Sequence, residues 1–76
     1  MAVKIYTTST CPYCKQAKEF FKEKRVKFTE LDVSKDEKAL HEMIKKSSQM
    51  GVPVININGQ IVVGFDKEKI AGLIDK

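Results

Sequence analysis

The sequence predicts an α/β domain with one mixed four-stranded sheet flanked by helices, in the element order β-α-β-α-β-β-α. Short runs of alternating or β-branched apolar residues are typical of strands, and apolar residues at three- and four-residue spacing are typical of helices. An Asn-Gly pair between two β-branched runs adds a hairpin. With 76 residues the chain has room for one modest core, so we expect a single domain over residues 1–76.

The first strand and the first helix meet at a polar turn. Residues 2–6 alternate and predict a short strand that ends at the Thr/Ser cluster 7–10. Pro12 suits the first position of a helix, since its missing N–H would have no partner within the helix. We expect this helix to end near Lys24. Its apolar stripe consists of Cys14, Ala17, Phe20 and Phe21.

The second strand and helix follow. Residues 26–33 predict a strand, but its apolar positions change parity between Phe28 and Leu31, which favours a bulge or an early strand end. Ser34 or Asp36 can then cap a helix. The apolar stripe of that helix consists of Leu40, Met43, Ile44 and Ser47.

A hairpin and a last helix complete the pattern. Residues 54–57 and 60–63 flank Asn58-Gly59, which suits a type I′ turn because both of its central positions need positive φ. Asp66 is a good N-cap for a final helix, which Gly72 weakens. The two strands joined by the first helix should be parallel through a right-handed crossover, and the hairpin strands antiparallel.

Charge and cysteine use narrow the class of function. The net charge of +4 comes from 14 basic and 10 acidic residues that are interleaved, which suits small anions or acidic partner surfaces and gives little support for nucleic-acid binding. A monomer is the default expectation for the oligomeric state. We expect no membrane span and no signal peptide, and therefore a cytoplasmic protein. In that compartment, a close cysteine pair is more often catalytic or metal-binding than structural.

The positions of Cys11 and Cys14 predict different roles. Cys11 falls at the N-terminus of the first helix, where free N–H groups and the helix dipole favour an anion, so it should supply the thiolate nucleophile of disulfide exchange. Cys14 falls on the inward stripe of that helix. It is therefore the candidate for the resolving thiol, which displaces the mixed disulfide and closes the Cys11–Cys14 disulfide.

Other uses of the two cysteines are weaker. A structural disulfide between residues three apart would close a very small loop and constrain the unfolded chain little. A zinc site needs about four ligands, whereas the chain offers two cysteines and His41, which lies off the apolar stripe. We therefore expect no metal site, although a metal or iron–sulfur carrier remains the alternative from another class.

Three motifs in order resemble the glutaredoxin family, within the thioredoxin-fold superfamily. Residues 6–14 (Tyr-Thr-Thr-Ser-Thr-Cys-Pro-Tyr-Cys) resemble its strand and dithiol motif, Val52-Pro53 its cis-proline motif, and Gly64-Phe65-Asp66 the segment before its last helix. The resemblance covers essentially the whole chain. It implies a thioredoxin fold and a glutathione-dependent thiol–disulfide oxidoreductase for protein disulfides and glutathione mixed disulfides, with glutathione as reducing cosubstrate and no bound cofactor.

The resemblance also implies a glutathione site. Tyr13 would shape its groove, and Val52, before a cis Pro53, would pair through its backbone with the cysteinyl part of glutathione. Asp66 and the amides of Phe65 and Asp66 would hold the γ-glutamyl end at the start of the last helix.

The site departs from the family pattern where the glycyl carboxylate would bind. Thr8 and Ser9 stand where many members carry a lysine, so Gln49 or Lys46 is the candidate for that contact. The Gly64-Phe65 pair is similar to glutaredoxin-like electron donors of ribonucleotide reductase, which thioredoxin reductase recharges. Those proteins often lack Pro-Tyr between their cysteines, so glutathione is the expected electron source and thioredoxin reductase the alternative.

Overall fold

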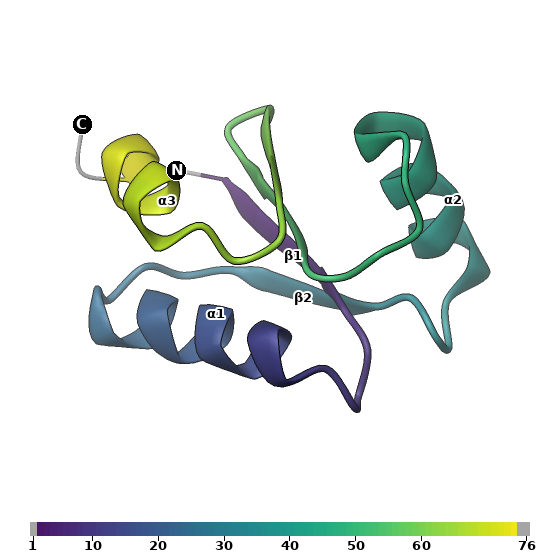
Figure 1. Cartoon of the computed structure of the whole chain (residues 1–76), viewed down its shortest axis with the longest axis horizontal. Coiled ribbons are helices and arrows are strands. Elements are labelled where there is room, and N and C mark those ends of the chain that lie inside the picture. Colours follow the sequence, from purple (N-terminus) through teal and green to yellow (C-terminus); the bar gives the residue numbers. More distant parts are fainter. Residues whose placement is uncertain (1, 75–76) are drawn as a thin grey trace.

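The computed structural model describes residues 2–74, which form one sheet with helices on both of its faces (Figure 1). The elements follow the predicted order: β1 (Val3–Thr7), α1 (Pro12–Glu23), β2 (Thr29–Asp32), α2 (Glu37–Ser47), β3 (Val54–Ile57), β4 (Gln60–Val63) and α3 (Lys67–Ile74). No helix in this part of the chain is both long and apolar enough to cross a membrane.

The four strands lie in the order β2-β1-β3-β4, so β1 and β3 form the centre of the sheet. β1 runs parallel to β2 and antiparallel to β3, and β3 runs antiparallel to β4. The mixed sheet and its hairpin were both predicted. The hairpin turn has the expected backbone, with φ of 52° at Asn58 and 91° at Gly59.

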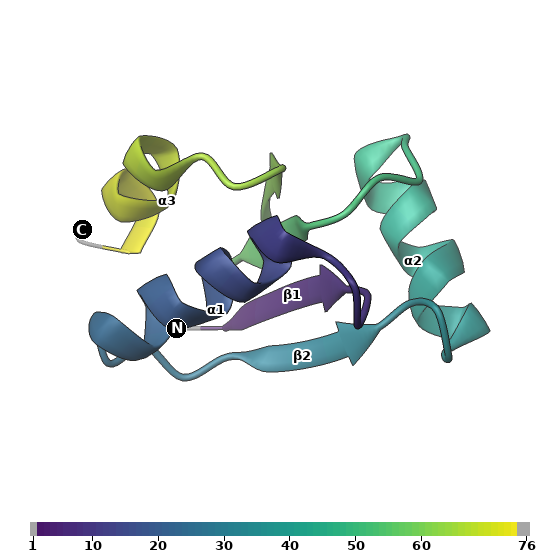
Figure 2. The same ribbon diagram turned by 60° about the horizontal axis from the view of Figure 1, so that its bottom comes forward.

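Two separate apolar clusters hold the helices on the sheet. α1 and α3 cover one face and α2 covers the other, and Figure 2 shows α1 and α3 grouped away from α2. The larger cluster comprises Val3, Ile5, Ala17, Phe20, Phe21, Ile55, Ile57, Val62, Ile70 and Ile74. The smaller one comprises Tyr6, Val33, Ala39, Met43 and Val54. The central strands therefore contribute buried side chains to both faces.

The second strand is shorter than the predicted run 26–33, and that prediction is wrong at its N-terminal side. α1 ends in a Schellman motif, in which Arg25 has a φ of 59°. The N–H of Arg25 donates to the carbonyl of Lys22 (3.1 Å) and that of Val26 to the carbonyl of Phe21 (2.9 Å). These bonds hold Val26 in the helix-ending turn, so β2 begins only at Thr29 and the change of parity falls outside it.

Tyr6 lies at a polar position of the predicted alternation but is fully buried on the α2 face. Its hydroxyl donates to Glu42 of α2, and burial and this bond raise the pKa of Tyr6. The same bond lowers the pKa of Glu42, which also pairs with Lys4 (3.5 Å) and Lys46 (3.4 Å). A polar tie therefore joins β1 to α2.

Aspartates cap the two later helices. Of the two candidates for α2, the structure selects Asp36, whose Oδ1 accepts from the N–H of Ala39 (3.1 Å). Asp66 caps α3 as predicted, and its Oδ1 accepts from the N–H of Lys69 (3.2 Å).

Candidate active site

Three loops meet at one end of the sheet. Tyr6 lies opposite Val54 in the antiparallel β1–β3 pair, so the loop that leaves β1 and the loop that enters β3 share this end. The N–H of Gly64 donates to the carbonyl of Pro53 (2.8 Å) and brings the loop after β4 to the same place. Figures 1 and 2 show the second and third of these loops beside the N-terminal end of α1. The three sequence motifs therefore lie together at this end of the sheet.

Cys11 is the N-cap of α1. Its backbone is extended (φ −93°, ψ 112°), and Pro12 occupies the first helical position. Its Sγ accepts a hydrogen bond from the N–H of Cys14 (3.1 Å), which would otherwise lack a partner in the first turn of the helix. The partly exposed sulfur thus lies against a backbone donor and the positive end of a helix dipole.

Cys14 lies on the inner side of the same turn and is 1% exposed. Burial, followed by its contact with the Cys11 side chain, raises the pKa of the Cys14 thiol to about 12. Both cysteines are free thiols. The helix therefore presents one accessible sulfur and holds a second, buried sulfur behind it, and the place of Cys14 on the inward stripe predicts this burial.

The Val52–Pro53 peptide bond is cis, as the resemblance implies. Pro53 is buried and Val52 half-buried. The backbone N–H and C=O of Val52 make no hydrogen bond within residues 2–74, so both are free to pair with an extended ligand. Tyr13 is 61% exposed and stands at the start of α1.

The other predicted glutathione contacts are partly engaged within the protein. The Phe65 ring packs edge-on against Phe20, with 5.9 Å between ring centroids, so this partly buried side chain is engaged against the core. The Asp66 carboxylate caps α3. The amide of Gln49 is turned back on its own loop, where Nε2 donates to the carbonyl of Gly51 (3.2 Å).

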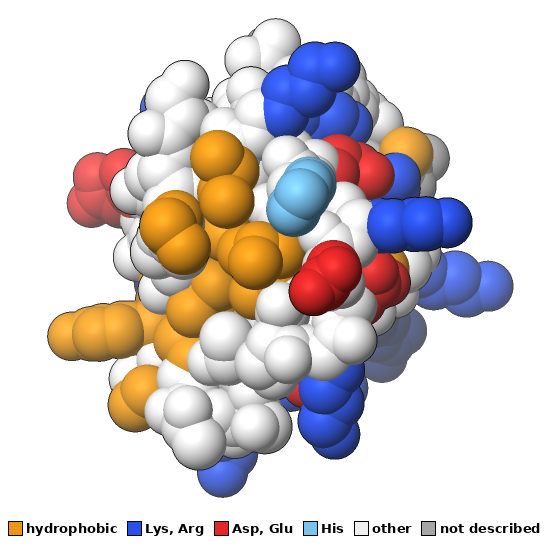
Figure 3. All heavy atoms as spheres, turned by 90° about the vertical axis from the view of Figure 1, so that its right-hand side faces the viewer, with side chains coloured by type: hydrophobic (Ala, Val, Ile, Leu, Met, Phe, Trp, Pro, Cys, Tyr) orange, Lys and Arg blue, Asp and Glu red, His pale blue; other side chains and the backbone are white. Residues whose placement is uncertain are grey.

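Exposed apolar side chains surround this end of the molecule. Met50 in the loop before β3 is 69% exposed, and Val63 at the end of β4 is 50% exposed. Figure 3 shows the α2 side of the molecule, where apolar side chains gather beside His41, the single histidine of the chain. His41 lies on the surface, as expected from its position off the apolar stripe.

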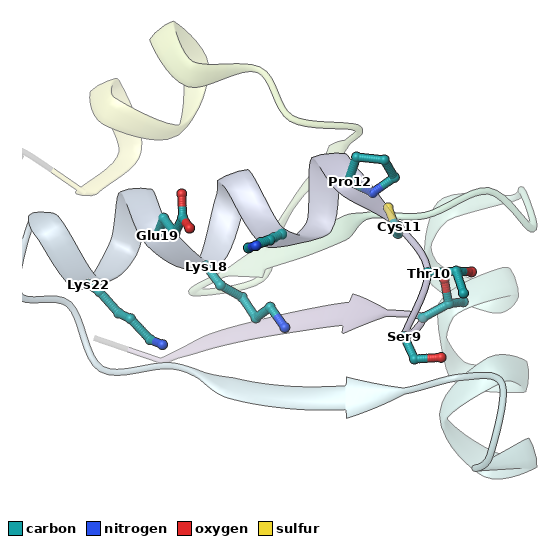
Figure 4. A pocket seen from close by; sticks show the side chains of 9 residues that line it. Ser9, Thr10, Cys11, Pro12, Lys18, Glu19 and Lys22 are labelled. Atoms are coloured by element: carbon teal, nitrogen blue, oxygen red, sulfur yellow. The ribbon is translucent and has the colours of Figure 1, made fainter.

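A groove along α1 was missed in the sequence. It has a volume of about 480 Å³ and runs from the 8–10 turn past Cys11 along the helix (Figure 4). Its charged lining consists of Lys15, Lys18, Glu19 and Lys22. The available signal was the spacing of Cys11 and the three lysines, which places all four on one side of a helix.

One lysine of this groove is held by a neighbouring strand. Lys18 Nζ lies 2.7 Å from Oε2 of Glu30 on β2, and the buried Thr7 hydroxyl donates to the same oxygen (3.1 Å). The Lys18 contact is the main reason that the pKa of Glu30 is lowered. In the described part of the chain, no three His, Cys, Asp or Glu side chains lie close enough together to hold a metal ion.

Comparison with known proteins places the dithiol and cis-proline motifs within one family. The family model for glutaredoxin matches residues 3–62, which include both cysteines and the cis-proline. The chain belongs to the glutaredoxin family. This glutaredoxin has the thioredoxin fold, and its family assigns it to the thiol–disulfide oxidoreductases.

Individual relatives of this glutaredoxin cover most of its length. It is 51% identical over 74 residues to an uncharacterized glutaredoxin-like 8.6 kDa protein in the rubredoxin operon of Clostridium pasteurianum, covering 97% of this chain and 99% of that one. It is 44% identical to glutaredoxin 3 of Escherichia coli K12, over 84% of this chain and 77% of the relative. The crystal structure of a glutaredoxin from Archaeoglobus fulgidus superposes with a TM-score of 0.89 at 32% identity, covering 97% of this chain and 86% of that one.

Proposed function

We propose that this glutaredoxin reduces protein disulfides and glutathione mixed disulfides in the cytoplasm, as a monomer without a bound cofactor, and that glutathione recharges it. The observation that carries the proposal is the asymmetry of the two sulfurs. The Cys11 sulfur is partly exposed at a helix N-terminus, where an anion is favoured, and Cys14 is buried and protonated directly behind it.

The proposed cycle begins at Cys11. Its thiolate attacks one sulfur of the substrate disulfide, forms a mixed disulfide, and expels the other sulfur as a thiolate that takes up a proton. Cys14 then loses its proton and attacks the Cys11 sulfur, which releases the reduced substrate and leaves the Cys11–Cys14 disulfide. Two molecules of glutathione reduce this disulfide and leave as glutathione disulfide, so the electrons balance.

The free backbone of Val52 supports a binding mode for glutathione. Its N–H and C=O can pair with the cysteinyl residue and align the glutathione sulfur beside Cys11, with Tyr13 along the edge of the glutathione site. The backbone N–H groups of Phe65 and Asp66, together with Asp66 itself, receive the γ-glutamyl end. Gln49 reaches the glycyl carboxylate only after giving up its bond to Gly51.

Recharging by thioredoxin reductase is the second candidate. The residues at the glycyl end of the proposed glutathione site favour it. Thr8 and Ser9 bring no positive charge there, and Lys46 is paired with Glu42. Glutathione would therefore be held with fewer charged contacts than the family pattern provides.

Two assays separate these candidates. Turnover of a small glutathione mixed disulfide is measured once with glutathione and glutathione reductase, and once with thioredoxin reductase. The proposal expects the first system to support turnover, and activity in the second alone would overturn the glutathione part of it. Cys14→Ser should retain turnover of the mixed disulfide and lose reduction of protein disulfides, whereas Cys11→Ser should lose both. An active Cys11→Ser variant would reverse the roles of the two thiols.

A further inference from the structure

The groove along α1 lies on a different side of Cys11 from the proposed glutathione contacts. Glutathione would contact the loops that enter β3 and leave β4 and, at its glycyl end, the 8–10 turn, whereas the lysines of the groove lie further along α1 (Figure 4). The proposed glutathione contacts do not include the α1 lysines of this groove. A peptide substrate, whose chain continues beyond the reacting cysteine, would reach it.

The groove is basic along its length. Lys15, Lys18 and Lys22 follow Cys11 at four-, three- and four-residue steps, so their side chains share one side of the helix with the sulfur. Glu19 is the acidic residue in the lining. Lys18 is neutralised by Glu30 at 2.7 Å, but within residues 2–74 neither Lys15 nor Lys22 forms an ion pair. Two cations are thus available to a ligand.

The positions of Lys15 and Lys22 along the helix determine which residues of a bound extended peptide would lie beside them. Helical rise is about 1.5 Å per residue, which places Lys15 about 6 Å and Lys22 about 16 Å along the axis from Cys11. An extended peptide advances about 3.3 Å per residue, so these distances correspond to about two and about five residues from its cysteine. The groove would therefore favour carboxylates at two defined places on one side of the substrate cysteine.

We propose that the α1 groove binds an acidic segment of the protein substrate, with carboxylates about two and five residues to one side of the cysteine that Cys11 attacks. This rests on the proposed function and assigns a substrate class to it. Lys15 and Lys22 pair with the substrate carboxylates while Lys18, held by Glu30, forms the floor between them. The contact raises the rate of attack by holding the substrate sulfur near Cys11.

The test uses the Cys14→Ser protein, in which the reaction stops at the mixed disulfide. Three ten-residue peptides with one cysteine carry no charged side chain, aspartates two and five residues before the cysteine, or aspartates two and five residues after it. Each is joined through its cysteine to 5-thio-2-nitrobenzoate. Attack by Cys11 on the peptide sulfur forms the protein–peptide disulfide, breaks the activated one and releases the coloured thiolate, whose absorbance gives the rate.

One of the two acidic peptides should react about fivefold faster than the neutral peptide at low salt, and the other within about twofold of it. The advantage should vanish near 1 M salt, where the Debye length is about 3 Å. Lys15→Gln/Lys22→Gln should also abolish it. Lys38→Gln/Lys45→Gln removes the same charge from exposed positions on α2, across the sheet, and should preserve it.

Three results would overturn the proposal: equal acceleration by both acidic peptides, equal effects of the two double variants, or no acceleration at all. Dividing each rate by that of the neutral peptide removes any change in the reactivity of Cys11 itself. If the neutral peptide also failed to react, the proposed function would be at fault, so the two failures are distinguishable.

Discussion

Alkylation of the two thiols provides a direct test of their asymmetry. Burial and the Cys11 contact raise the pKa of Cys14 from 9.0 to about 12. At a pH well below the pKa, each unit by which the pKa rises lowers the thiolate fraction about tenfold, so Cys14 should hold about a thousandfold less thiolate than an ordinary cysteine at neutral pH. Alkylation by iodoacetamide follows the thiolate, and the 1% exposure of Cys14 restricts access further.

The measurement uses each thiol alone. In Cys11→Ser, Cys14 keeps its burial, which is the largest cause of its raised pKa. Its alkylation rate at pH 7.5, followed by intact mass, should be at least about a hundredfold below the rate for the same variant unfolded in urea, with the remaining reaction passing through transient opening. Cys14→Ser is the matched control, in which the partly exposed Cys11 should react readily without denaturant. A folded Cys14 that reacts within tenfold of its unfolded rate would refute the assignment of a buried, protonated resolving thiol.

Three further predictions concern stability. Tyr6→Phe should lower the free energy of unfolding in urea by about 1 to 1.5 kcal/mol. This is near the lower end for a hydrogen bond to a charged group, because the Glu42 side chain is 36% exposed. An unchanged urea midpoint would show that the Tyr6–Glu42 bond does not stabilise the packing of α2 on β1. Gly59→Ala, at a φ of 91°, should destabilise by about 1 kcal/mol, whereas Gly72→Ala, at an exposed position of α3, should stabilise by about 0.5 to 1 kcal/mol; changes of the same sign would contradict the turn assignment. Glu30 and Glu42 have lowered pKa values when folded, so their contribution is complete above about pH 4.5 and is lost as pH falls through the folded pKa. Unfolding at pH 6 and pH 3 should show this loss, and Glu30→Gln/Glu42→Gln should reduce the difference between the two.

Local patterns were sufficient to predict most of the fold. The Asn58-Gly59 pair and the Asp66 cap are short-range signals whose geometry depends on few neighbours, and the structure confirms both. The start of β2 was not predictable in this way, because Arg25 adopts a left-handed backbone that is usually left to glycine. Nor was the burial of Tyr6, which packs in one cluster with Ala39 and Met43 of α2, a helix distant in sequence.

In the candidate site, too, features set by neighbouring residues were predictable and features set by distant contacts were not. The Cys11–Cys14 spacing and Pro12 placed the thiols correctly on the helix, since all three lie within one turn. Whether the Gln49 amide is free depends on how its loop folds back, which no local pattern records. The groove depends on the 8–10 turn lying alongside α1, so the lysines appear in the sequence as an ordinary solvated helix face.

In the proposed redox cycle, the hydrogen bond from the Cys14 N–H to the Cys11 sulfur would also link the stability of α1 to the oxidation state of the two cysteines. An anionic sulfur is a stronger acceptor than a sulfur in a disulfide, so reduction strengthens the N-cap of α1 and oxidation weakens it. By thermodynamic linkage, whatever stabilises the dithiol over the disulfide raises the reduction potential of the pair. A cap difference of about 1 kcal/mol corresponds to about 20 mV for this two-electron couple. One backbone amide would thereby make the proposed Cys11–Cys14 disulfide a stronger oxidant and the dithiol a weaker reductant.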